Sequence, residues 1–256
     1  MNAALPTLTI APLPGLPLVE PGDNLADMIA EGLARTGLAL QAGDALVVTS
    51  KIVSKAEGRI VALDAVTPSA EAERLAAVTG KDARIVELVL RESVAVSRAA
   101  PGVLVTRHRL GFTAANAGVD QSNLAGGDER ALLLPLDPDG SARALRASLR
   151  ARVGVAPAVV ISDSQGRPFR LGGVGVALGV AGMPALVDLR GQADLFGRAL
   201  KITLQGYADL VASAAQLVSG EAAEGCPVTL VRGLRMPPGD GRASDLYRAP
   251  EHDLYG

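Results

Sequence analysis

The sequence has little of two residue types on which disulfide-rich and zinc-binding proteins depend. Among 256 residues there is one cysteine, Cys226, and there are two histidines, His108 and His252. A single cysteine excludes an internal disulfide framework and is typical of a reducing compartment, so we expect a cytoplasmic protein. The same scarcity excludes zinc modules built from cysteine or histidine.

Aromatic residues are also scarce, and the chain has no large excess of charge of either sign. Three Phe, three Tyr and no Trp leave few side chains on which nucleobases could stack, and the core must be aliphatic. With 25 basic and 27 acidic residues, the chain has no overall field that attracts nucleic acid or an anionic membrane. We therefore expect neither as a partner.

No apolar run is long enough to cross a membrane. The longest, residues 174–189, is interrupted by Gly175, Gly179, Gly182 and Pro184, whereas a spanning helix needs about 20 apolar residues. This run predicts a buried strand and a turn. No basic residue leads an apolar segment at the start of the chain, so we expect no signal peptide.

The remaining pattern predicts an α+β protein, because strands and helices are interspersed without the strict alternation of a doubly wound sheet. The length allows one large domain or two small ones, at roughly 150 residues per domain. A helix capped by Asp23 should end at Gly37. Further strands are expected at 8–13, 45–49, 59–63, 103–107, 158–162 and 227–231, and further helices at 69–79, 83–99, 139–152 and 202–218.

Glycine-rich nucleotide motifs are absent or have the wrong spacing. No segment ends in the Gly-Lys-Ser/Thr of a phosphate-binding loop. Glycines recur in residues 170–179, but the glycine after Gly173 and Gly175 comes one residue too late for a dinucleotide fingerprint. Close packing of a β-rich segment is the better interpretation.

A cluster of hydroxyl and ammonium groups follows the strand predicted at 45–49. Ser50, Lys51 and Lys55 would lie at the carboxyl end of that strand, where ligands commonly collect, and they suit phosphate oxygens. Taken alone, the segment is better explained by a surface loop that carries two ordinary lysines.

Oxygen ligands for a metal occur in three further places. Asp120 and Asn123 lie in the polar segment 116–123, which an Asx-turn would also explain. Asp163 follows an apolar strand, where a helix N-cap would look the same, and Glu221 or Glu224 follows a helix. Together these oxygen donors favour Mg²⁺ or Mn²⁺ with a phosphorylated ligand over zinc.

Several motifs then occur in a fixed order along nearly the whole chain. They are Gly15-Leu-Pro-Leu-Val19 with Gly22-Asp23, Ser50-Lys51-x-x-Ser54-Lys55-x-Glu57-Gly58, Arg107-His108, Ala115-Asn-Ala-Gly-Val-Asp120-x-Ser-Asn123, Ser162-Asp163-Ser164, Gly220-Glu221 with Pro227, and Gly241-Arg-Ala-Ser-Asp-Leu246. This set closely resembles the coenzyme F420-0:L-glutamate ligases, the γ-glutamyl ligases of the deazaflavin coenzyme.

The resemblance implies an α+β fold of two lobes with mixed and antiparallel sheets, and an intertwined homodimer. The ligase domain would span residues 1–236, followed by a polar tail, 237–256, that either is disordered or clasps a neighbour through Tyr247, His252 and Tyr255. The implied activity is a GTP-dependent ligation of L-glutamate to coenzyme F420-0 through an acyl phosphate, with GDP and phosphate released. Two Mg²⁺ or Mn²⁺ ions per site are implied, with K⁺ as a monovalent activator.

The resemblance also assigns roles to residues. Asp120 and Asp163 would hold the first metal, and Ser164 and Glu221 would serve the second. The remaining nucleotide contacts would be Leu16, Pro17, Leu18, Val19, Ser50, Lys51, Lys55, Asn123, Ser219, Gly220, Glu221, Ala222, Ala223, Glu224, Gly225 and Cys226.

Two positions depart from the family pattern. Family members carry threonine where Ser164 stands, which keeps the hydroxyl, and glutamine where Glu221 stands, which here becomes a negative charge. Two other classes remain open: a metal-dependent phosphohydrolase that uses the same carboxylates, and a module that binds GTP without catalysis.

Overall fold

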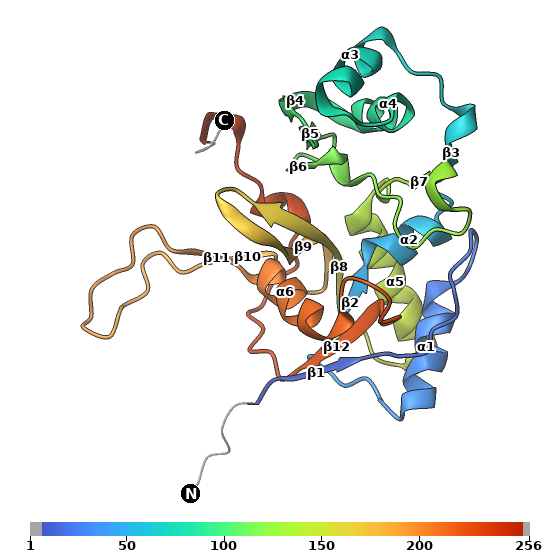
Figure 1. Ribbon diagram of the computed structural model, residues 1–256. Coiled ribbons are helices and arrows are strands. Elements are labelled where there is room, and N and C mark those ends of the chain that lie inside the picture. The colour runs from blue at the N-terminus through green and yellow to red at the C-terminus, as the bar shows by residue number, and fades with distance from the viewer. Residues whose placement is uncertain (1–6, 253–256) are drawn as a thin grey trace, which may run out of the picture.

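A computed structural model describes residues 7–252, and it has one central sheet with helices on both faces (Figure 1). The sheet order is β1-β12-β2-β8-β9. Only β2 and β8 run parallel, and the other neighbouring pairs are antiparallel. Their bounds are β1 (Thr9–Pro12), β12 (Val228–Arg232), β2 (Ala45–Thr49), β8 (Ala158–Arg167) and β9 (Arg170–Ala181).

Residues 45–48 of β2 and 158–161 of β8 are all apolar and buried, because both faces of the sheet are covered there. In β2, Leu46 and Val48 pack with α1 (Leu25–Thr36) and α5 (Pro138–Val153) on one face. Ala45 and Val47 belong to the core that α6 (Tyr207–Ser219) closes on the other face. Because successive side chains of a strand point to opposite faces of the sheet, neighbouring residues of β2 belong to different cores.

A separate core lies beyond the short pair β3 (Ile60–Ala62) and β7 (Arg130–Leu132). The chain between them forms α3 (Ala70–Thr79), α4 (Ala83–Arg91) and the sheet β4-β5-β6. Its strands are β4 (Ser93–Ala100), β5 (Val103–His108) and β6 (Thr113–Ala115), and short 3-10 helices η1 (Leu63–Ala65), η2 (Asn116–Gly118) and η3 (Gly127–Glu129) flank it. In Figure 1 these elements, apart from η3, stand above the central sheet.

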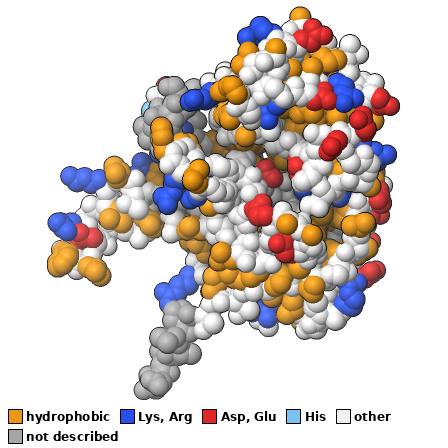
Figure 2. Space-filling model, in the orientation of Figure 1, with side chains coloured by type: hydrophobic (Ala, Val, Ile, Leu, Met, Phe, Trp, Pro, Cys, Tyr) orange, Lys and Arg blue, Asp and Glu red, His pale blue; other side chains and the backbone are white. Residues whose placement is uncertain are grey.

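The hairpin β10 (Leu186–Asp188) and β11 (Leu204–Gly206) carries an arm that projects from the central sheet (Figure 1). Leu195 and Phe196 in this arm are 100% and 83% exposed, and Figure 2 shows apolar side chains at its end. No helix within residues 7–252 is long and apolar enough to cross a membrane.

The α+β class and most predicted elements are confirmed, but three predictions were wrong in detail. The helix predicted at 83–99 ends at Arg91, because Glu92 turns its carboxylate inward to two arginines and the β-branched Val94 and Val96 continue in β4. Residues 202–206 include β11 rather than the start of α6. The cap of α1 is Asn24, not Asp23, and Gly37 ends the helix in the left-handed conformation as predicted.

The described part of the predicted tail packs against its own chain. Residues 237–252 form η4 (Ala243–Leu246) and η5 (Pro250–His252), and Ala243 is buried. The amide of Ala243 donates to Asp139, and the ring of Tyr247 contacts that of Phe112. His252 is exposed at the end of the described chain, and Tyr255 lies outside the described residues.

Candidate functional site

The parallel pair β2 and β8 brings two distant segments together. Helix α2 (Ser50–Ala56) begins where β2 ends, and Thr49 pairs with Ser162 on β8. The next residues, Ser50 and Asp163, are therefore neighbours, and Ser50 Oγ donates to Asp163 Oδ1 at 3.1 Å. The parallel register thus places a hydroxyl beside a carboxylate at one edge of the sheet.

Asp120 reaches the same place from the loop that follows η2. Its backbone exchanges two hydrogen bonds with Leu132, of 3.1 and 2.8 Å. Ser122 donates its backbone amide to Asp120 Oδ1 and its hydroxyl to Oδ2, each at 2.9 Å. Lys51 Nζ lies 2.6 Å from Asp120 Oδ2 and also donates to the carbonyl of Ser122. The carboxylate is held from both the loop and helix α2.

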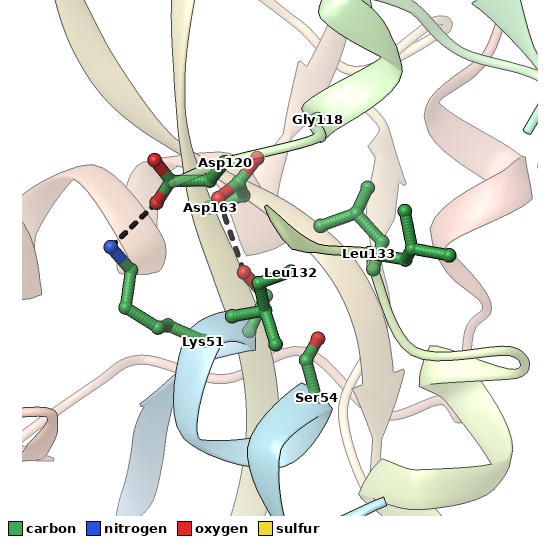
Figure 3. A pocket seen from close by; sticks show the side chains of 9 residues that line it. Lys51, Ser54, Gly118, Asp120, Leu132, Leu133 and Asp163 are labelled. Atoms are coloured by element: carbon green, nitrogen blue, oxygen red, sulfur yellow. Dashed lines mark hydrogen bonds and ion pairs between the residues drawn. The ribbon is translucent and has the colours of Figure 1, made fainter. Parts of the chain in front are cut away.

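These groups line a small cavity of about 20 Å³. Figure 3 shows Asp120 and Asp163 on the same side of it, with Lys51 joined to Asp120 and with Ser54 on the next turn of α2. The other wall is made by Gly118 and the apolar side chains of Leu132, Leu133 and Leu134. A charged cluster therefore meets an aliphatic wall.

The two carboxyl groups have pKa values shifted in opposite directions. Burial raises the pKa of Asp163 to about 6, and the nearby charge of Asp120 adds to this, although Ser50 and the amide of Ser164 oppose it. Burial alone would also raise the pKa of Asp120, but the hydrogen bonds from Lys51 and Ser122 outweigh it and hold that pKa below its usual value. Asp163 is the carboxylate that lacks a cationic partner.

Lys55 and Asn123 connect this cluster to the loop after α6. Lys55 Nζ donates to the carbonyl of Asn123 at 2.8 Å, and Asn123 Nδ2 donates to the carbonyl of Ala222 at 3.1 Å. Burial and the neighbouring charge of Lys51 lower the pKa of Lys55. Asn123 has a positive φ of 55°, which asparagine tolerates better than most residues.

The side chains of Glu221 and Ser164, which were also predicted for the site, make no hydrogen bond or ion pair with Asp120 or Asp163 within residues 7–252. Glu221 is exposed and makes no hydrogen bond or ion pair with the described residues. Ser164 is exposed and accepts from Gln216 Nε2 at 3.2 Å. In the segment after β1, Leu18 is 85% exposed, whereas Val19 is buried in the core. The loop of residues 219–226 is closed on itself by Glu224, which accepts from the amide of Ala222.

The two carboxylates and the hydroxyl groups of the cluster are donors of the kind that hard divalent cations prefer. Among residues 7–252, no three His, Cys, Asp or Glu side chains group closely enough to hold a metal. Asp120 and Asp163 do line one cavity together with hydroxyl groups, and oxygen donors of this kind suit Mg²⁺ or Mn²⁺. Ser54 Oγ, buried in the same wall, has no hydrogen-bond partner.

The sequence reasoning missed three residues of this cluster. Ser122 positions Asp120, and its signal was its place two residues after an aspartate, which is the spacing of an Asx-turn. Ser54 lies one turn after Ser50 on α2, so helical periodicity places both on the same face. Leu132 gave no signal, because its contact with Asp120 depends on the fold alone.

The glycines of residues 170–179 serve packing, as predicted. A Cβ at Gly175 would lie 2.5 Å from the carbonyl oxygen of Ala212 in α6, and one at Gly179 would lie 2.3 Å from that of Pro138 in α5. Both helices therefore approach β9 where a side chain is missing. No phosphate-binding turn is involved.

The family model described as F420-0:Gamma-glutamyl ligase matches residues 15–233. The chain is 48% identical to the coenzyme F420:L-glutamate ligase of Methanopyrus kandleri over 98% of both chains. It is 45% identical to the protein of the same name from Methanothermobacter thermautotrophicus, over 94% of this chain and 96% of the other. The protein of that name from Methanocaldococcus jannaschii is 41% identical over 94% of each.

Proposed function

Because the chain belongs to the F420-0:gamma-glutamyl ligase family, we propose that it joins L-glutamate to coenzyme F420-0 in a reaction driven by GTP. The relatives that match over nearly their whole length are named for this ligation. The observation that carries the proposal is the meeting of Asp120, Asp163 and Lys51 at one cavity, from three separate segments of the chain. This is a suitable site for phosphoryl transfer, which depends on positioning and charge.

The proposed reaction has two steps. A carboxylate oxygen of coenzyme F420-0 attacks the γ-phosphorus of GTP, the bond to the β-phosphate oxygen breaks, and GDP leaves. The amino nitrogen of L-glutamate then attacks the acyl carbon, the bond to the phosphate oxygen breaks, and phosphate leaves. The α-ammonium group of glutamate loses two protons in all, one before the attack and one as the amide forms.

The side chains of the cluster supply the charge that this reaction needs. Lys51 and Lys55 offer ammonium groups to phosphate oxygens, and the hydroxyl of Ser50 holds Asp163 in place. Asp120 and Asp163 would hold a divalent cation, which when bound offsets negative charge on the phosphate groups. Glu221, Ser164 and the loop of residues 219–226 would complete a second cation site and the nucleotide wall once GTP is bound, and K⁺ would act as a further activator.

We also propose the division into two lobes, a tail from residue 237 and a homodimer. The core between η1 and β7 is separate from the two cores of the central sheet, which supports the lobes. The exposed apolar residues of the β10–β11 arm support association with a second copy of the chain. Light scattering tests the dimer: replacing Phe196 and Ile202 by aspartate should yield monomers, and an unchanged mass would exclude the arm as its interface.

Mass spectrometry tests the ligase directly. The acceptor is incubated with GTP, L-glutamate and Mg²⁺ or Mn²⁺, and we expect coenzyme F420-0 to gain the mass of at least one glutamyl unit. Omitting GTP should abolish the gain. Release of phosphate without any gain in mass would instead indicate a phosphohydrolase, and binding of GTP without phosphate release would indicate a non-catalytic module.

A further inference from the structure

A second, larger cavity lies beside the cluster and shares Asp120 with it. Its volume is about 330 Å³, which is in the range of small-molecule sites. The segment that joins α3 to α4 forms one wall, and the residues around η2 form the other. Ile85 and Val119 supply apolar surface.

Two polar groups in this cavity have no partner within the described chain. Lys81 is half-buried and makes neither an ion pair nor a hydrogen bond. Asn116 Oδ1 is buried and accepts no hydrogen bond. A buried polar atom without a partner costs free energy, so both groups are suited to a ligand that supplies the missing contacts.

The other polar groups of the cavity are already engaged. Asp82 caps α4 and binds the guanidinium of Arg84, and Gln121 Nε2 donates to the carbonyl of Asp128. The unpaired groups are therefore one cation and one hydrogen-bond acceptor, with the carboxylate of Asp120 beside them. A ligand that matches them has an anionic group at one end and an ammonium group at the other.

We propose that this cavity is the subsite for the incoming amino acid, which deepens the proposed ligase function and rests on it. A carboxylate of L-glutamate binds the ammonium of Lys81, and its amino group donates to Asn116 Oδ1. The methylene groups pack on Ile85 and Val119. Because Asp120 lies in both cavities, this pose directs the amino group to the place where the acyl phosphate forms.

The charges of the cavity favour an amino acid over a nucleotide. A nucleoside triphosphate would bring several negative charges to a wall that carries Asp82 and Asp120 and only one unpaired ammonium. L-Glutamate carries a net charge of only −1, and in this pose its ammonium group faces the carboxylates while one of its two carboxylates faces Lys81.

Steady-state kinetics of Lys81→Gln test the proposal. The KM for L-glutamate should rise about tenfold or more, as expected for the loss of one charge-assisted hydrogen bond, while the KM for GTP is unchanged. Lys81→Arg should restore part of the affinity, because it keeps the charge. Arg150→Gln, which removes an exposed positive charge near the end of α5, is the matched control and should behave as the unaltered protein.

Calorimetric titration adds a readout that is independent of turnover. Asn116 has a positive φ of 53°, so Asn116→Gly removes the amide without straining the backbone. This variant should bind L-glutamate more weakly but bind glutarate, which lacks the amino group, as before.

Two results would overturn the assignment while leaving the ligase intact. One is a protein that ligates glutamate normally and whose glutamate KM is unaffected by Lys81→Gln. The other is an equal rise in the KM values of glutamate and GTP, which would show that Lys81 acts only on the structure. Failure of the unaltered protein to ligate glutamate would instead contradict the proposed function itself.

Discussion

Lys51 Nζ and Asp120 Oδ2 lie 2.6 Å apart, and this ion pair joins helix α2 to the loop after η2. The ammonium group therefore sits where a divalent cation held by Asp120 would also place its charge. A cation held by Asp120 would compete with Lys51 for the carboxylate, and the displaced lysine would be free to contact a phosphate group.

This relationship predicts opposite effects of Lys51→Met on two ligands. Affinity for Mn²⁺ in the absence of nucleotide should rise several-fold, because the competing ammonium is gone. Affinity for GTP should fall about tenfold or more, since a charged hydrogen bond to phosphate is lost. Free Mn²⁺ is measured by electron paramagnetic resonance and GTP binding by calorimetry, with Arg150→Met as the control. Unchanged Mn²⁺ affinity would show that the cation does not use Asp120.

Asp163→Asn should abolish ligation while it stabilises the fold above neutral pH. The folded pKa of about 6 lies above the ordinary aspartate value of 3.8, so ionised Asp163 opposes folding at high pH. A difference of about two units corresponds to about 3 kcal/mol. In the presence of a metal chelator, the Tm of the variant should exceed that of the unaltered protein above pH 6. This difference in Tm should vanish below pH 4. A lower Tm at pH 8 would contradict this account.

Much of this architecture follows from local patterns. The apolar run of β2 and the left-handed glycine after α1 gave nearly correct bounds, because burial on both faces and helix termination act within a few residues. The break between α4 and β4 was missed because it depends on Glu92 meeting Arg59 and Arg109, which are distant in sequence.

In the candidate site, too, some residues follow from local sequence patterns and others depend on contacts between distant segments. The family motifs named Asp120, Asp163 and Lys51, and the register of β2 against β8 explains why the start of α2, which carries Lys51, lies beside Asp163. Lys81 lies outside these motifs, and Asn116 lies within one of them without being given a role. An unpaired lysine and a buried amide oxygen are recognisable only when their surroundings are known.

Glu92 should make stability depend on pH in acid. Burial raises its pKa, but His108, Arg109 and Arg59 together outweigh burial and hold that pKa at about 2, against the ordinary glutamate value of 4.5. Ionised Glu92 therefore stabilises the fold above pH 4.5, by about 3 kcal/mol, and this contribution is lost as the pH falls toward 2. Glu92→Gln should lower the urea midpoint strongly at pH 7 and little at pH 2.5. An equal loss at both would assign the effect to packing.

Gly175→Ala should loosen α6 from the sheet, whereas Gly166→Ala on the same hairpin should not. The new Cβ at Gly175 would meet the backbone of Ala212 at 2.5 Å, and backbone cannot rotate away as a side chain can. Nothing lies within 4 Å of a Cβ at Gly166, which makes that variant the control.

Overpacking at Gly175 costs about 1–3 kcal/mol, so the Tm of Gly175→Ala should fall by about 5 °C. GTP affinity should fall as well, because α6 leads into the loop of residues 219–226, which is the proposed wall of the nucleotide site. Asn123 donates a hydrogen bond to Ala222 in that loop. Equal Tm values for the two variants would show that β9 and α6 separate without cost.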